Sequence, residues 1–138
     1  PKSSRTRLCK VIMKDTHKMD FPSFIKHMEK ARSYFKEELD KGHTVLCNCY
    51  AGVNRSCSSI AYYAMTERGM RLEDAIRYIK EAKFILEQEN SIYPRERKPL
   101  LGKAFRKYTI INKTFHKYLT YIDKCLKNGV GFPYTNCK

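Results

Sequence analysis

The strongest indication of a fold lies in the middle of the chain. Residues 43–49 are apolar and β-branched at their centre, which is typical of a buried strand. Residues 50–54 form a turn around Gly52, and residues 56–68 have the spacing of a helix that Gly69 ends. A strand that passes through a tight turn into a helix is a common unit of α/β folds. We therefore expect an α/β protein with a short, mostly parallel central sheet flanked by helices.

The turn carries residues suited to binding and attacking an anion. Its backbone N–H groups can face inward and the helix start adds a positive dipole, so Cys49 should be a thiolate at neutral pH. Arg55 can fold back to grip two oxygens of the anion, and Ser56 can offer its hydroxyl to the sulfur. Gly52 permits a backbone conformation that a side chain would hinder. Together these groups suit thiolate attack on a phosphate monoester, through a phosphocysteine intermediate.

The leaving oxygen of such a reaction needs a proton, which a carboxylic acid on a neighbouring loop would supply before activating water as a base. Asp15 is one candidate, and it follows the apolar run 8–13, which we interpret as a strand. Asp20 is the competing acid. Its position suits the cap of a helix over residues 21–39, although Ser23 could also be that cap.

The rest of the chain is predicted to complete one domain of 138 residues. We expect helices over 72–86 and 112–126, an exposed basic insertion at about 91–108, and an irregular tail over 128–138. The inward face of the helix over 72–86 is expected to consist of Leu72, Ala75, Ile76 and Ile79.

Composition limits the classes of partner and cofactor. Lys and Arg number 28 against 14 acidic residues, and a net charge of +14 attracts nucleic acid, anionic membranes or phosphorylated proteins. No run approaches the roughly 18–20 apolar residues of a transmembrane segment, and no secretory signal is visible, so we expect an intracellular protein, cytoplasmic or nuclear. The six cysteines lack zinc-site spacing, so we expect no metal and no cofactor.

The pattern C-x5-R-[ST] between a strand and a helix is the signature of cysteine-based protein tyrosine phosphatases. The segments VLCNCYAGVNRS at 45–56, AYYAM at 61–65 and GMRLEDA at 69–75 resemble a small dual-specificity phosphatase, and AGVNRS is similar to viral members. The resemblance covers about residues 8–126. It implies an enzyme that hydrolyses phosphotyrosine, and phosphoserine or phosphothreonine as well, on a phosphorylated protein substrate.

The resemblance also implies roles for particular residues. Cys49 would be the nucleophile, Arg55 would bind phosphate, and Ser56 would assist release of the thiolate. Asp15, which lies 34 positions before Cys49, would be the general acid and then the base. Asn112 precedes a Phe-x-x-x-Leu helix and would brace the phosphate loop. That loop would consist of Tyr50, Ala51, Gly52, Val53, Asn54 and Arg55.

The chain departs from the family in three places. Asn48 replaces a His that helps to order the loop and to favour the thiolate, which predicts reduced activity or a shifted pH optimum. Only 14 residues precede Asp15, so we expect the fold to lack the usual N-terminal strand-rich segment. The exposed sheet edge that remains would favour a homodimer formed by exchange of elements. The basic insertion at 91–108 is the third departure.

Two alternative functions stay open beside the protein phosphatase. An RNA 5′-triphosphatase of the same superfamily, with RNA as partner, would fit the net charge. A weakly active phosphate-binding module would fit Asn48. Cys47 and Cys57 lie close to the nucleophile in sequence, and either could form a disulfide with oxidised Cys49 or could simply fill the core.

Overall fold

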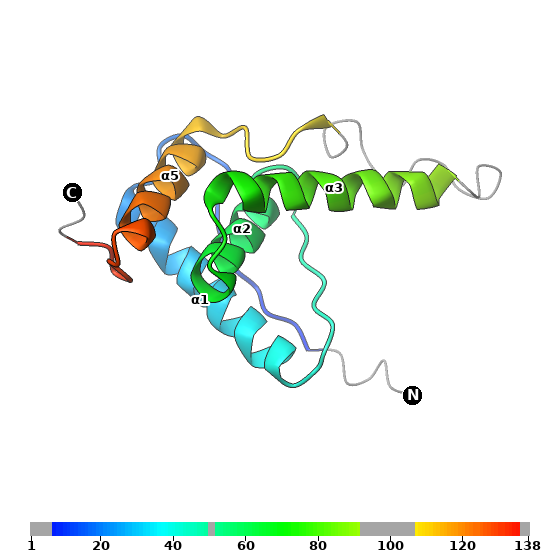
Figure 1. Cartoon of the computed structure of the whole chain (residues 1–138), viewed down its shortest axis with the longest axis horizontal. Helices are drawn as coiled ribbons and strands as arrows, with labels where there is room; N and C mark the ends of the chain where they lie inside the picture. Colours follow the sequence, from blue (N-terminus) through cyan, green and yellow to red (C-terminus); the bar gives the residue numbers. More distant parts are fainter. Residues whose placement is uncertain (1–6, 50–51, 92–106, 136–138) are drawn as a thin grey trace.

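The structure is a computed structural model that describes residues 7–49, 52–91 and 107–135, and the side chains of all of these except 87–91. Figure 1 shows α2 at the centre of the molecule, with α1 and α5 packed beside it and α3 extending away from the body. The helices it labels are α1 (Phe21–Asp40), α2 (Arg55–Arg68), α3 (Leu72–Ser91) and α5 (Lys113–Lys127).

Helix α1 confirms the helix predicted after residue 20. Asp20 is its cap, because its carboxylate accepts a hydrogen bond from the backbone N–H of Ser23 at 2.8 Å. Pro22 lies in the first turn, where its missing N–H costs no intrahelical hydrogen bond. The buried face of α1 consists of Phe24, Ile25, Met28, Ala31, Phe35 and Glu38.

Helix α2 supplies the centre of the core, and its residues contact α1, α3 and α5. Phe115, Leu119 and Ile122 of α5 are fully buried, as the predicted apolar stripe of that helix requires. Helix α3 continues to residue 91, five residues beyond the predicted end. The fully buried side chains with the largest volumes are Tyr62, Tyr134, Phe24, Phe115, Met28, Leu119 and Ile122.

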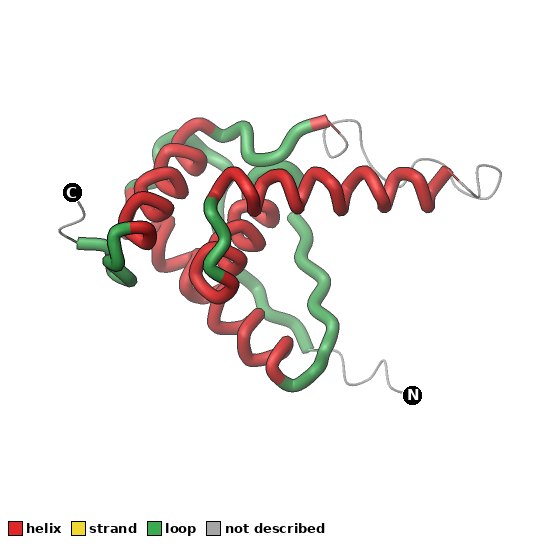
Figure 2. Tube along the Cα trace, viewed as in Figure 1, coloured by secondary structure: helices red, strands yellow, loops and turns green. Residues whose placement is uncertain are grey.

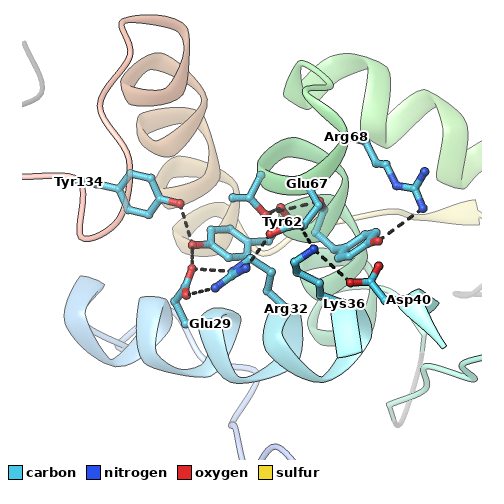
Figure 3. Close-up of polar contacts among 10 residues, drawn as sticks. Glu29, Arg32, Lys36, Asp40, Tyr62, Glu67, Arg68 and Tyr134 are labelled. Atoms are coloured by element: carbon cyan, nitrogen blue, oxygen red, sulfur yellow. Dashed lines mark hydrogen bonds and ion pairs between the residues drawn. The ribbon is translucent and has the colours of Figure 1, made fainter. Parts of the chain in front are cut away.

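A polar network joins α1 to α2 and to the C-terminal segment (Figure 3). The hydroxyl of Tyr62 donates to the carboxylate of Glu29 and lies 2.7 Å from the hydroxyl of Tyr134. Arg32 bridges Glu29 and Glu67, at 2.8 and 2.6 Å. Because each of these buried or half-buried polar groups has a partner, the network holds α1 against α2 without a desolvation penalty for unpaired groups.

The expected α/β architecture is wrong for this structure: the residues that it describes form no strand and no sheet (Figure 2). Segments 8–13 and 43–49 are present as loops. Apart from the N–H of His43, which donates to Glu38, neither segment makes a backbone–backbone hydrogen bond with another described residue. A strand exists only when a neighbouring strand completes its hydrogen bonds, so apolar, β-branched composition alone did not produce a sheet.

These two segments instead border a groove of about 870 Å³. Its lining includes Ala31 and Phe35 of α1 and Ser59 of α2, together with most of both segments. Leu8 and Leu46 are 86% and 89% exposed, because no neighbouring strand among the described residues covers them. Both segments run toward the N-terminal end of α2 (Figure 1).

None of the helices in the described ranges is long and apolar enough to cross a membrane. The predicted basic insertion at 91–108 lies outside the described residues, apart from the backbone of residue 91, Lys107 and Tyr108. Residues 128–135, within the predicted irregular tail, contain turns and neither a helix nor a strand.

Candidate active site

Cys49 ends the extended segment 43–49 and lies at the N-terminal end of α2. Its sulfur is 3.2 Å from the Ser56 hydroxyl oxygen and 3.4 Å from the Ser56 backbone nitrogen. Partial burial raises the pKa of the thiol. Hydrogen bonds from the Ser56 hydroxyl and from the Ser56 and Gly52 amides, together with the charge of Arg55, lower it by more than burial raises it. The net result is a pKa below the usual thiol value, which favours the thiolate.

Two other thiols close to Cys49 have the opposite property. Burial raises the pKa of Cys47 to about 12, and burial also raises the pKa of Cys57. Both are free cysteines, with the Cys57 sulfur 3.3 Å from the carbonyl oxygen of Gly52. Of these three thiols, only Cys49 therefore has an environment that favours its thiolate form.

Arg55 begins α2, beside the sulfur. One of its terminal nitrogens donates to the carbonyl of Met13 at 3.3 Å. Its Nε is buried and has no hydrogen-bond partner within the described part of the chain. Since an unpaired buried N–H is costly, this guanidinium has capacity for an acceptor that the described residues do not supply.

The Asp15 carboxylate is joined by hydrogen bonds to the described part of the predicted phosphate loop. One oxygen accepts from the side-chain amide of Asn54 at 2.8 Å, and the other accepts from the side-chain amide of Asn112 at 2.7 Å. The side-chain oxygen of Asn54 in turn accepts from the backbone N–H groups of Ile111 and Asn112. These bonds bring the predicted acid, the phosphate loop and the start of α5 into one assembly.

Asn112 also caps the N-terminus of α5. Its side-chain oxygen caps α5 by accepting from the N–H groups of Thr114 and Phe115, at 3.0 and 3.1 Å. The amide nitrogen of this side chain is thereby directed to Asp15. Asp20 makes the corresponding cap for α1 and lies outside this assembly, so of the two candidate acids Asp15 is the one joined to the site.

Three of the remaining predicted residues, Asn48, Gly52 and Val53, belong to the part of the chain that the structure describes. Gly52 has φ = 68°, a left-handed conformation that favours glycine, and Val53 beside it is buried. Asn48 is exposed and lines the groove. Tyr50 and Ala51 lie outside the described residues. No group of His, Cys, Asp or Glu within the described ranges could hold a metal ion.

The sequence predicts only part of the role of Asn54 and no role for Lys83. Asn54 was assigned to the phosphate loop only, whereas its side chain connects Asp15 to α5. Lys83 was not assigned any role, yet it is buried and donates to the carbonyl of Gly52 at 2.9 Å. A signal for Lys83 existed, because it follows Ile79 by four residues and so continues the inward face of α3.

Comparison with known proteins identifies the family of the chain. The dual specificity phosphatase catalytic domain family matches residues 1–95, more than half of the chain. The chain therefore belongs to the dual-specificity phosphatase family, as the resemblance predicted. The match includes both Asp15 and the segment from Cys49 to Ser56.

Individual relatives include viral and cellular proteins. A candidate tyrosine phosphatase of Invertebrate iridescent virus 6 is 28% identical over 60 residues, covering 44% of this chain and 42% of the viral protein. A candidate tyrosine-protein phosphatase of Acanthamoeba polyphaga mimivirus is 29% identical over 58 residues, covering 42% of this chain and 27% of its own length. Human dual specificity protein phosphatase 4 is 34% identical over 74 residues, covering 54% of this chain and 18% of its own length. The aligned part is thus less than half of each relative. No solved structure matches the chain significantly.

Proposed function

We propose that this protein hydrolyses phosphate monoesters on phosphorylated proteins, with phosphotyrosine and phosphoserine or phosphothreonine as substrates, through a phosphocysteine intermediate. The observation that carries the proposal is the placement of the Cys49 sulfur at the start of α2, beside Arg55, 3.2 Å from the Ser56 hydroxyl oxygen and 3.4 Å from the Ser56 backbone nitrogen, and these groups lower the pKa of the thiol. Family membership supports the same reaction class. A thiolate that amides and a guanidinium stabilise is the nucleophile that such a reaction requires.

The first step transfers the phosphoryl group to the protein. The Cys49 thiolate attacks phosphorus, a sulfur–phosphorus bond forms, and the bond to the leaving oxygen of the substrate breaks. Arg55 binds two of the phosphoryl oxygens and stabilises their charge in the transition state. Asp15, in its protonated form, gives its proton to the leaving oxygen.

The second step releases inorganic phosphate. The Asp15 carboxylate takes a proton from a water molecule that attacks the phosphocysteine, and the sulfur–phosphorus bond breaks. The hydroxyl of Ser56, 3.2 Å from the sulfur, stabilises the departing thiolate. Asn54 and Asn112 orient the carboxylate of Asp15 for this step through their two hydrogen bonds.

Hydrolysis of a small aryl phosphate between pH 5 and 8, without added metal, tests the proposal. We expect the wild-type protein to hydrolyse the aryl phosphate and the Cys49→Ser variant to be inactive. The turnover number of Asp15→Asn should fall by about 100-fold, which is within the range of general acid catalysis. Asp20→Asn is the matched control and should retain wild-type turnover, because Asp20 caps α1. Equal turnover by the wild type and Cys49→Ser would refute the proposal.

Phosphopeptides then test the substrate class. We expect the wild type to cleave peptides that carry phosphotyrosine and peptides that carry phosphoserine or phosphothreonine. Cleavage of phosphotyrosine peptides alone, across a broad panel, would contradict dual specificity while leaving the thiolate mechanism intact.

A further inference from the structure

Lys83 lies on α3, and its side chain is buried against the phosphate loop. It is 6% exposed, although residues 80–82 and 84–86 on either side of it are exposed. An ammonium group is rarely buried unless its donors are hydrogen-bonded, because its desolvation is costly. The position of Lys83 therefore needs an explanation in terms of its partners.

Those partners belong to two segments that are far apart in sequence. The ammonium donates to the carbonyl oxygen of Gly52 at 2.9 Å, to the carbonyl oxygen of Tyr108 at 2.8 Å and to the hydroxyl oxygen of Thr109 at 3.2 Å. Hydrogen bonds of this kind compensate an ammonium group for the water that it loses on burial. Lys83 thus joins the phosphate loop to the segment that precedes α5.

The contact with Gly52 determines which way the peptide groups of the loop face. In a planar trans peptide the C=O and the following N–H point in opposite directions, so holding the Gly52 carbonyl toward Lys83 turns the N–H of Val53 away from Lys83. The backbone N–H of Ile110 donates to the Val53 carbonyl oxygen at 2.8 Å. By the same peptide geometry, this contact turns the N–H of Asn54 away from Ile110.

We infer that Lys83 is a positioning residue of the phosphate loop, which holds the Gly52 carbonyl behind the loop so that the following N–H groups face the bound phosphate. Lys83 acts through Gly52 and touches neither the sulfur nor the substrate. The inference deepens the proposed function and rests on it, since it assigns the phosphate of that reaction to these N–H groups.

The test replaces Lys83 with methionine, which keeps the length of the side chain and removes its donors. Lys80→Met is the matched control, because Lys80 is exposed on the same helix. The affinity for inorganic phosphate is measured by the protection that phosphate gives Cys49 against alkylation, and kcat and KM are measured with an aryl phosphate. Circular dichroism establishes that each variant is folded.

We expect Lys83→Met to bind phosphate about tenfold more weakly and to lose at least as much in kcat/KM, because displaced loop donors miss the anion. The pH of half-maximal Cys49 alkylation should rise, since the Gly52 amide that faces the sulfur is displaced as well. Lys83→Arg, which keeps a cation and several donors, should recover part of the loss, and Lys80→Met should match the wild type.

A folded Lys83→Met variant with wild-type phosphate affinity and an unchanged alkylation profile would overturn the inference. If Lys83→Met does not fold, the Thr109→Val variant tests the inference instead. It removes one acceptor of the ammonium group and leaves Lys83 in place. We then expect about threefold weaker phosphate binding, a smaller loss than in Lys83→Met because Lys83 keeps its contact with Gly52, and unchanged affinity would overturn the inference. Phosphate protection needs no turnover, so a wild-type protein that binds phosphate and hydrolyses nothing would refute the proposed function separately.

Discussion

The two sides of α1 differ in how completely they are covered. On the side that faces α2 and α5, Phe24 and Met28 are fully buried and Tyr62 completes a polar network with Glu29. On the side of the groove, segments 8–13 and 43–49 expose apolar side chains and leave their backbone largely without hydrogen bonds to described residues. The candidate catalytic groups lie at the end of the second, less covered side.

The difference follows from where each kind of element finds its hydrogen bonds. A helix satisfies its backbone within itself, so α1, α2 and α5 need from their neighbours only apolar contact. An extended segment needs a neighbouring strand, and the described residues supply none. We therefore expect substitutions on the helical side to change stability, and substitutions at the end of the groove to change catalysis.

The largest effect is expected from Arg55→Lys. Lysine keeps the charge but cannot grip two phosphoryl oxygens, so kcat/KM should fall by about 1,000-fold, the scale of losing one oxyanion donor. The melting temperature should stay close to that of the wild type, which thermal circular dichroism would measure. Arg68→Lys, at the exposed end of the same helix, is the control. A large loss of stability in Arg55→Lys with little loss of kcat/KM would contradict the claim that substitutions at the end of the groove change catalysis and not stability.

The second effect concerns the thiols near the site. Because the pKa of Cys49 is lowered and that of Cys47 is raised to about 12, Cys49 alone should be alkylated quickly near neutral pH. The raised pKa of Cys47 leaves little of its thiolate at neutral pH, so its alkylation rate should be well below that of Cys49. Peptide mapping after a timed reaction with iodoacetamide measures both rates. Comparable labelling of the two cysteines would contradict the assignment of Cys49 as the thiolate.

On the helical side, Tyr62→Phe should lower the free energy of unfolding by about 1–3 kcal/mol, because it leaves the buried Tyr134 hydroxyl without its partner. Urea denaturation measures the change, and kcat/KM should remain near wild type. Tyr63→Phe is the matched control, since the Tyr63 hydroxyl makes only a 3.4 Å contact with exposed Arg68 among the described residues, and it should change stability little. A loss of kcat/KM in Tyr62→Phe as large as that in Arg55→Lys would contradict the claim that the helical side of α1 serves stability and the groove side serves catalysis.

The smallest effect is expected from Asp123→Asn on α5. The Asp123 carboxylate accepts from the first N–H of α3, that of Leu72, at 2.9 Å and pairs with Arg71. Asparagine can still accept from this N–H, so the substitution removes only the negative charge at the start of α3 and should cost about 0.5 kcal/mol at neutral pH. The Arg71 side chain and this N–H lower the pKa of Asp123 despite partial burial. The stabilisation is therefore full above the unfolded-state pKa of about 3.9 and is lost as the pH falls through the lower folded-state value.

Urea denaturation of both proteins from pH 7 to pH 3 measures this dependence. The difference in unfolding free energy between wild type and Asp123→Asn should shrink below pH 4. A difference that is constant over the whole range, or that grows as the pH falls, would show that the carboxylate does not contribute in this way.

Much of the site could be predicted because its residues are close in sequence. Cys49, Arg55 and Ser56 belong to one turn, so local spacing was enough to bring them together. The helices were equally predictable, since the period of apolar residues such as Phe115 and Leu119 reports burial directly.

The remaining features depend on contacts between distant segments. Strand pairing is such a contact, and the segments 8–13 and 43–49 have strand composition without a partner among the described residues. Asn54 and Lys83 likewise act through residues 31–58 positions away, as the contacts of Lys83 with Gly52 and of Asn54 with Asn112 show. A pattern in one segment carries no information about which distant group it will meet.

The central claim is that Cys49 receives the phosphoryl group. The most direct measurement is mass spectrometry of the peptide that contains Cys49, after acid quenching of Asp15→Asn during turnover of an aryl phosphate with a good leaving group. Loss of the base slows the second step, so we predict one phosphoryl group on Cys49, and none in an Asp15→Asn/Cys49→Ser double variant. Release of phosphate by Asp15→Asn without any phosphorylated Cys49 peptide would contradict the account.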